Sequence, residues 1–198
     1  NSLDHYEGYD VSATADFSDL PFVGGDLRVQ LQWTHLVENT TVDATGVSDD
    51  YVGQCYDFGE SCFNRDRSTG LFTWSKGDWT VNWVTRFMSG ISAPEDALNY
   101  FDVANGGANP YTGAAFPAGV LEDVMDTYSI EDFYYHNASV SYQYDDNTRV
   151  NVAITNVFDE EAPYYKSFFG FVDPQINSPQ NTYDIVGQYV TASVSYSF

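Results

Sequence analysis

The last ten residues, Tyr189–Phe198 (YVTASVSYSF), alternate between apolar and polar side chains. Val190, Ala192 and Val194 fall at every second position, with Thr and Ser between them. A period of two is typical of a β-strand, in which successive side chains point to opposite faces. This stretch therefore predicts a strand with one apolar and one polar face.

Six further segments show the same alternation. They comprise residues 9–17, 27–34, 70–74, 79–87, 137–144 and 149–155, and only the segment at 70–74 leaves its two faces unassigned. We expect an all-β, antiparallel fold with seven strands in this chain.

The connections between these segments alternate in length. Short links at 18–26, 76–78 and 145–147 carry the Gly, Pro, Asp and Asn residues of turns, whereas the links at 37–66, 90–132 and 159–182 are long. In a meander, short and long links then fall on opposite rims, which is typical of an outer-membrane β-barrel. The run 183–198 also exceeds the roughly 9–11 residues that a tilted strand needs to cross a bilayer.

Aromatic residues lie near the ends of the expected strands on their apolar faces, where a membrane interface favours them. They are Trp33, Trp74, Trp79, Tyr142, Tyr144, Tyr196 and Phe198. The alternative is a soluble β-fold in which the same rings fill a core.

The composition excludes other classes of protein. Among 198 residues, 7 Lys plus Arg against 29 Asp plus Glu give a net charge of −22, which argues against a nucleic-acid partner. An aromatic content of 17% argues against disorder. No run is long and apolar enough to predict a transmembrane helix.

Seven strands cannot close a bacterial barrel, because such barrels have even strand numbers and an open edge in lipid leaves backbone groups unpaired. Either one strand is missed or the chain is the C-terminal part of a larger barrel. Strand parity favours the second interpretation, so we expect an upward strand to precede Asn1.

Two segments carry a resemblance to a known family. The run 150–164 (VNVAITNVFDEEAPY) resembles the N-L-F-D-x-x-P-P region of TonB-dependent outer-membrane receptors, and the run from Tyr183 to Phe198 resembles their final strand. Gln188 departs from the pattern, because that family usually has a basic residue there. The resemblance implies an antiparallel transmembrane β-barrel of about twenty-two strands, with residues 1–198 as its C-terminal segment of seven or so strands.

The resemblance also implies a function and partners. It implies TonB-dependent uptake of a scarce nutrient (iron–siderophore, cobalamin, oligosaccharide or peptide) across the outer membrane of a Gram-negative bacterium, with no enzymatic step and no cofactor. The implied partners are the remaining barrel strands, the plug domain, TonB through a box that this chain lacks, outer-membrane lipid and a surface lipoprotein. A passive porin-like channel and a soluble β-rich binding module stay as alternatives.

Few residues are candidates for chemistry. His5, His35 and His136 are scattered, so no catalytic residue and no metal site is expected. A protein exported to the outer membrane meets an oxidising environment, which favours a disulfide between Cys55 and Cys62. The alternative is a zinc site, but no His lies nearby in the sequence.

Ligand contacts are expected in the long loops. Aromatic and amide side chains suited to a sugar ring or a peptide gather there, with self-packing of the loops as the alternative; they are Tyr100, Asn105, Tyr111, Phe116, Phe168, Phe169 and Phe171. The acidic loops attract cationic ligands or only provide solubility. Tyr196 and Phe198 are expected to act as a barrel-assembly signal, and Arg28, Arg86 and Arg149 to face plug carboxylates.

Overall fold

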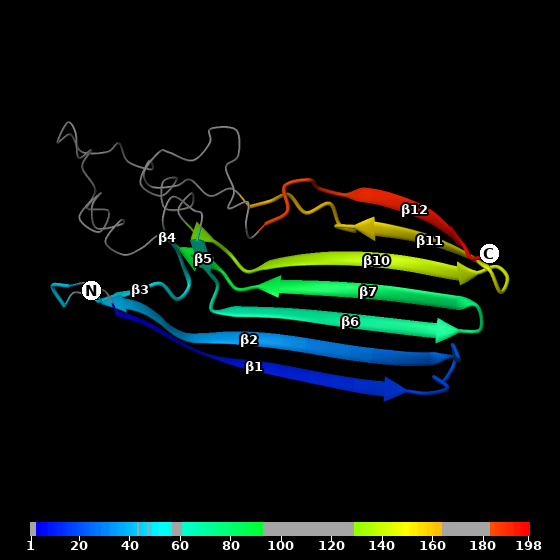
Figure 1. The fold of residues 1–198 in the computed structure, drawn as a ribbon, viewed down its shortest axis with the longest axis horizontal. Coiled ribbons are helices and arrows are strands. Elements are labelled where there is room, and N and C mark those ends of the chain that lie inside the picture. Colours follow the sequence, from blue (N-terminus) through cyan, green and yellow to red (C-terminus); the bar gives the residue numbers. More distant parts are fainter. Residues whose placement is uncertain (1–2, 43, 47, 57–60, 93–128, 164–182) are drawn as a thin grey trace.

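The computed structural model describes residues 3–42, 44–46, 48–56, 61–92, 129–163 and 183–198. They form one long antiparallel sheet with a small second sheet at one end (Figure 1). Seven strands follow one another across the long sheet: β1 (Leu3–Phe17), β2 (Asp26–Val42), β6 (Asp66–Lys76), β7 (Trp79–Met88), β10 (Phe133–Gln143), β11 (Thr148–Thr155) and β12 (Tyr189–Tyr196). The described residues contain no helix that is long and apolar enough to span a bilayer.

These seven strands confirm the seven expected segments in their expected order, as an antiparallel meander. The alternating stretch that starts at Tyr189 is confirmed, but the longer run 183–198 is not a single strand. The final strand begins at Tyr189, and the residues from Tyr183 to Gln188 precede it without strand pairing. Gly187 has a φ of 74°, and Tyr183 is buried. A left-handed glycine interrupts an extended backbone, so the strand cannot begin earlier.

The long connections contain strands that the alternation did not predict. β3 (Ser48–Asp50) pairs with β2, and the second sheet has the order β5 (Ser61–Phe63), β4 (Gln54–Tyr56), β8 (Ile91–Ser92) and β9 (Ser129–Ile130). Strands of two or three residues are too short to show a period. We call this four-stranded sheet the cap.

The turn rim is built from residues suited to tight links. The Asn147 backbone N–H donates to the Asp145 carboxylate at 2.9 Å, and this hydrogen bond lowers the pKa of Asp145. Gly25 has a φ of 78°, and a Cβ there would clash with the Ser75 carbonyl oxygen. The link between β1 and β2 therefore packs against the end of β6 only with glycine at this position.

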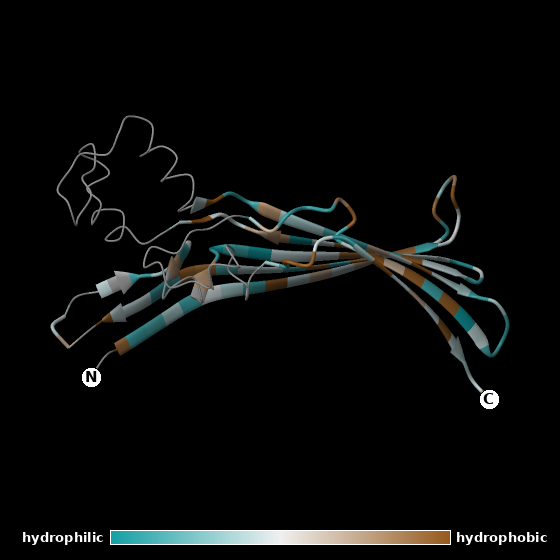
Figure 2. Cartoon of the chain, turned by 90° about the horizontal axis from the view of Figure 1, so that it is seen from above, coloured by the Kyte–Doolittle hydropathy of each residue, from teal (hydrophilic) through white to brown (hydrophobic). Residues whose placement is uncertain are grey.

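The strand register gives the long sheet two distinct faces. Each lateral row takes one residue from each strand, and one such row runs through Ala15, Val29, Phe72, Trp83, Ala138, Ile154 and Val190. We call this the apolar face. The next row along is mostly polar or charged and runs through Asp16, Arg28, Thr73, Asn82, Ser139, Ala153 and Thr191. We call that side the polar face, and the banding along the strands is visible in Figure 2.

The buried core does not lie on the apolar face. It lies at the cap end, where the buried cluster consists of Cys55, Cys62, Met88, Ile91, Ile130, Tyr135 and Tyr183. The long sheet is thus a single layer over most of its length.

Candidate functional site

The apolar face is exposed, although its residues are those of a protein core. Leu31 is 48% exposed, Val140 39% and Val194 69%, and no second sheet covers them within the described ranges. A soluble sandwich buries such residues between two sheets. An uncovered face of this size needs an apolar environment, and a lipid bilayer provides one.

Two aromatic pairs mark the limits of this face. Trp79 and Tyr142 are paired residues of β7 and β10 with ring centroids 4.6 Å apart, and Phe87 and Tyr134 form a second pair at 4.9 Å. Eight residues separate the pairs along each strand, which is about 27 Å at a rise of about 3.4 Å per residue. At a tilt of 35–45° this spans about 20 Å of membrane depth, close to the apolar band of about 25 Å in transmembrane barrels.

On the apolar face, charged side chains begin just beyond the row of Phe87 and Tyr134, on the side of the cap. His35 Nδ1 lies 2.7 Å from Asp66 Oδ1, and the Trp33 indole N–H donates to the same carboxylate at 2.9 Å. Both His35 and Asp66 lie on the apolar face, two residues past the row of Trp33. Carboxylates are costly in hydrocarbon, so this pair marks where the lipid-facing band ends.

The polar face is held by hydrogen bonds between side chains of adjacent strands. Thr73 Oγ1 donates to Asn82 Oδ1 at 2.8 Å, and Asn82 Nδ2 donates to Ser139 Oγ at 3.2 Å. Ser141 Oγ donates to Asn151 Oδ1 at 2.9 Å further along the sheet. Polar side chains opposite a lipid-facing surface are typical of a barrel lumen.

The polar face carries charges of both signs, with Asp4, Asp10, Asp16, Asp26 and Arg28 on β1 and β2 and further arginines on the later strands. β6, β7, β10, β11 and β12 place Arg67, Arg86 and Arg149 on it and no carboxylate. Arg28 behaves differently from the expectation, because its Nε donates to Asp16 Oδ1 at 2.7 Å within the sheet. Arg28 therefore already has a carboxylate partner on the neighbouring strand.

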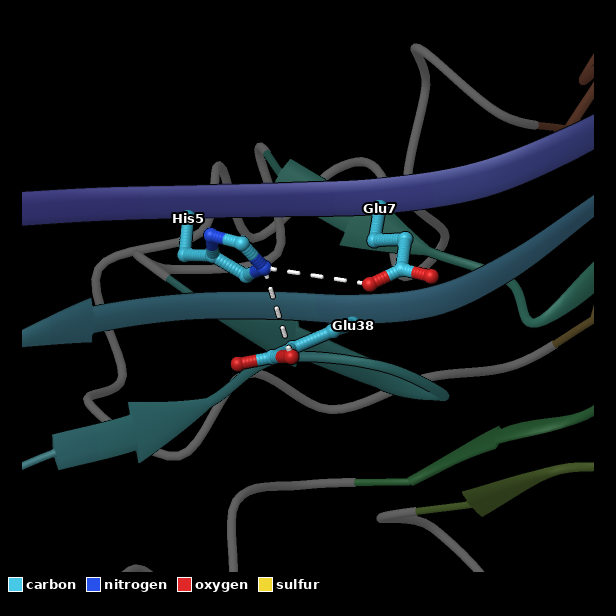
Figure 3. Close-up of side chains that lie close together, drawn as sticks. All are labelled: His5, Glu7 and Glu38. Atoms are coloured by element: carbon cyan, nitrogen blue, oxygen red, sulfur yellow. Dashed lines mark ion pairs between the residues drawn. The ribbon is translucent and has the colours of Figure 1, made fainter.

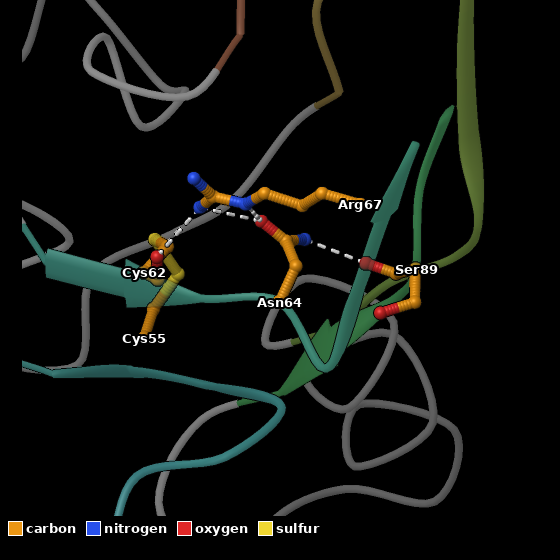
Figure 4. The surroundings of a disulfide bond; sticks show 5 residues. All are labelled: Cys55, Cys62, Asn64, Arg67 and Ser89. Atoms are coloured by element: carbon orange, nitrogen blue, oxygen red, sulfur yellow. Dashed lines mark hydrogen bonds between the residues drawn. A yellow bond between two sulfur atoms is a disulfide. The ribbon is translucent and has the colours of Figure 1, made fainter. Parts of the chain in front are cut away.

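The disulfide between Cys55 and Cys62 is present and lies in the cap. The two cysteines are directly opposite each other on β4 and β5 and are buried. Arg67 donates to the Cys62 carbonyl oxygen at 3.0 Å and to Asn64 Oδ1 at 2.9 Å, and Asn64 Nδ2 donates to the Ser89 carbonyl oxygen at 2.6 Å (Figure 4). The disulfide uses both thiols and so excludes the zinc alternative, and these contacts join the cap to β6 and β7.

The two segments that carry the family resemblance contact each other. Asn156 is buried with a φ of 53°, its Nδ2 donates to the Glu160 carbonyl oxygen at 2.8 Å, and its Oδ1 accepts the Glu160 N–H at 3.0 Å. Asp159 Oδ1 in the same loop accepts the Gln188 N–H at 2.8 Å. This loop therefore fixes the point at which β12 begins.

A second contact anchors the residues before β12. The Tyr135 hydroxyl donates to the Asp184 carbonyl oxygen at 3.1 Å and accepts the Asp184 N–H at 2.9 Å. Tyr183 packs edge-on against Phe133, and burial raises the pKa of its hydroxyl. The roles of Tyr135 and Tyr183 were not predicted, because their partners are distant in sequence. The role of Asn156 was not predicted either, because a side-chain bond to Glu160 within one loop leaves no period in the sequence.

The expected ligand-binding residues lie outside the described residues. These are Tyr100, Asn105, Tyr111, Phe116, Phe168, Phe169 and Phe171. Tyr196 ends β12, and its ring meets that of Phe198 edge-on at 5.3 Å, with both side chains exposed. Their role as an assembly signal stays a prediction.

The fold is that of a wall segment of an outer-membrane β-barrel. Solved structures of the ferric enterobactin receptor PfeA from Pseudomonas aeruginosa are similar to it. Two single-site mutants in complex with enterobactin have 14% and 13% sequence identity and TM-scores of 0.56 and 0.54, and a third mutant has 12% and 0.53. Each match covers 98% of this chain and 22% of the receptor.

Neither a protein-family profile nor a curated protein sequence matches the chain. The expectation of a barrel segment of a TonB-dependent receptor is confirmed at the level of the fold. The chain spans about a fifth of the length of these receptors.

Proposed function

We propose that this chain forms part of the barrel wall of a TonB-dependent receptor that takes up a scarce nutrient across an outer membrane. The observation that carries the proposal is the single-layer sheet, apolar and exposed on one side between two aromatic rows and hydrogen-bonded and polar on the other. The fold likeness to a receptor named for ferric enterobactin supports the same class. The chain performs no covalent chemistry in this function.

An anionic iron chelate is the cargo class that we propose to test first. Arg67, Arg86 and Arg149 face the polar side without an ion-pair partner among the described residues. On β6, β7, β10, β11 and β12 these arginines have no carboxylate beside them on the polar face, and such a local positive patch attracts an anion. The other cargo classes are cobalamin, oligosaccharides and peptides.

Energy-dependent uptake distinguishes the proposal from a passive channel. Cells that carry the full-length protein are given iron-55 bound to enterobactin, with and without a protonophore. We expect accumulation that stops when the proton gradient is lost. Accumulation that continues unchanged would identify a porin-like channel, whereas energised uptake of cobalamin alone would refute the anionic cargo and keep the receptor class.

A further inference from the structure

Three side chains converge on the apolar-face side of the sheet, beyond the aromatic rows. His5 and Glu7 come from β1 and Glu38 comes from β2 (Figure 3). His5 Nε2 lies 3.5 Å from Glu38 Oε2 and 3.9 Å from Glu7 Oε2, and one ligand atom of each residue lies within 4.8 Å of the others. We call these residues the edge triad.

The strand register brings the triad together. Glu7 is paired directly with Glu38, and the register shifts between Glu7 and Gly8, so that Val37 has no partner on β1. This bulge keeps Glu38 on the same face as Glu7 and His5. Two like charges directly opposite each other on neighbouring strands destabilise a sheet. A cation between the two carboxylates removes that repulsion.

The spacing fits a small divalent ion. Ligands bound at about 2.0–2.1 Å in a tetrahedral site lie about 3.3 Å apart. The distances from His5 Nε2 are 3.5 Å to Glu38 and 3.9 Å to Glu7, and all three ligand atoms lie within 4.8 Å of one another, so rotations of these partly or fully exposed side chains must bring them closer around an ion. Water then fills the fourth position.

The remaining oxygen of Glu38 already has a partner. The Thr40 hydroxyl donates to Glu38 Oε1 at 2.9 Å, while Oε2 faces His5. Thr40 is paired with His5 across the two strands. Such a contact orients a ligand carboxylate, as outer hydrogen bonds do in metal sites.

We propose that His5, Glu7 and Glu38 bind a divalent transition-metal ion such as Zn²⁺ and thereby join the outer ends of β1 and β2. One imidazole nitrogen with two carboxylates suits Zn²⁺ better than Ca²⁺ or Mg²⁺, which take oxygen ligands. A proton on His5 Nε2 occupies the same space and competes with the ion. The site does not depend on the proposed uptake function, because all three side chains project from the sheet face that is opposite to the polar face.

The test is a titration of the full-length protein with Zn²⁺ in detergent after EDTA treatment. We expect the wild type to bind one more equivalent than His5→Gln, and the affinity of that equivalent to fall about tenfold or more in Glu7→Gln and in Glu38→Gln. Asp4→Asn is the matched control, since Asp4 lies on β1 but on the opposite face, where it accepts the Thr41 hydroxyl. Asp4→Asn should bind the additional equivalent of Zn²⁺ with the same affinity as the wild type.

Three outcomes would overturn the proposal. The first is identical Zn²⁺ binding by the wild type and His5→Gln. The second is an equal loss of affinity in Asp4→Asn and Glu38→Gln, and the third is Ca²⁺ binding as tight as Zn²⁺ binding. Either of the last two shows that general negative charge holds the ion. Heat-dependent gel mobility checks that each variant is a folded barrel, and the side chains of His5, Glu7 and Glu38 are 56%, 52% and 41% exposed.

Discussion

Trp79 and Tyr142 lie directly opposite each other on β7 and β10, with ring centroids 4.6 Å apart, and Phe87 and Tyr134 repeat the arrangement eight residues further along. The first pair is next to the turn rim and the second is towards the cap. The exposed aliphatic face lies between them. The separation of the two pairs along the strands matches the thickness of a membrane's apolar band, and the first prediction depends on this match.

Charge should be tolerated on one face of β10 and not on the other. Val140 is on the apolar face between the aromatic pairs, and its neighbour Ser141 is on the polar face. We expect Val140→Arg to lower the free energy of unfolding in lipid vesicles by about 2 kcal/mol or more, because a charge near the bilayer centre is costly. Ser141→Arg is the matched control and should change it much less. Equal losses in the two variants would contradict a lipid-facing surface.

The disulfide should stabilise the cap and not the transmembrane wall. Replacing Cys55 and Cys62 by Ser opens a short loop, and the loop-entropy relation assigns roughly 2–3 kcal/mol to that closure. We expect faster amide exchange in β4 and β5 and unchanged exchange in β7 and β10. Reduction of the wild type should reproduce the effect, whereas the double variant should not respond to a reductant. Faster exchange in β7 would refute this separation.

Asn156 should contribute through both its side chain and its backbone angle. Asn156→Gly removes the two hydrogen bonds to Glu160 but still adopts a φ of 53° easily. Asn156→Ala removes the same hydrogen bonds and also makes that positive φ unfavourable. We expect Asn156→Gly to cost about 1–3 kcal/mol and Asn156→Ala to cost more. Amide exchange of Gln188 and Tyr189 measures the effect, since the same loop holds Gln188. Protection that is unchanged in both variants would show that the loop does not position β12.

Tyr183 should make the protein sensitive to alkaline pH. Its hydroxyl is buried and makes no hydrogen bond of regular geometry among the described residues. Burial raises its pKa, while the nearby Asn64 side chain and Arg67 act in the opposite direction. A group with a raised folded-state pKa contributes stability that is fully present below the unfolded value of about 10 and is lost as the pH rises through the higher folded value. Tyr183→Phe should therefore unfold at a higher pH than the wild type.

The control for this prediction is Tyr144→Phe, because Tyr144 is 71% exposed. It should leave the alkaline midpoint unchanged. Near neutral pH, Tyr183→Phe should be neutral or slightly stabilising, since it removes a buried hydroxyl that makes no hydrogen bond of regular geometry among the described residues. A midpoint that is the same in all three proteins would contradict the prediction.

Much of the sheet could be predicted because the alternation of apolar and polar residues is a property of each strand by itself. Alternation in β1, β2, β7, β10, β11 and β12 reports directly which residues share a face. The segment around Gly70 was ambiguous, because β6 places Gly70, Ser68 and Asp66 on the apolar face. Its assignment needed the register with β2 and β7.

The length of the last strand was overestimated for a related reason. The run 183–198 was counted as one crossing, but the residues from Tyr183 to Gln188 are held by Tyr135 and Asp159, which are distant in sequence. The short strands of the cap were not predicted, because two or three residues are too few to show an alternation. The edge triad was missed because His5 and Glu38 are more than thirty residues apart and only pairing brings them together.

The sequence by itself determined the all-β class, the order of the strands, the two faces of every long-sheet strand except β6, and the pairing of the two cysteines. These depend on interactions within one strand or one short loop, which leave a period or a spacing in the sequence. Only the tertiary structure decided that the apolar face stays uncovered, that the loop at Asn156 fixes the start of β12, and that His5 meets Glu7 and Glu38. Those features depend on register between strands, and hydrogen bonds between distant segments set that register.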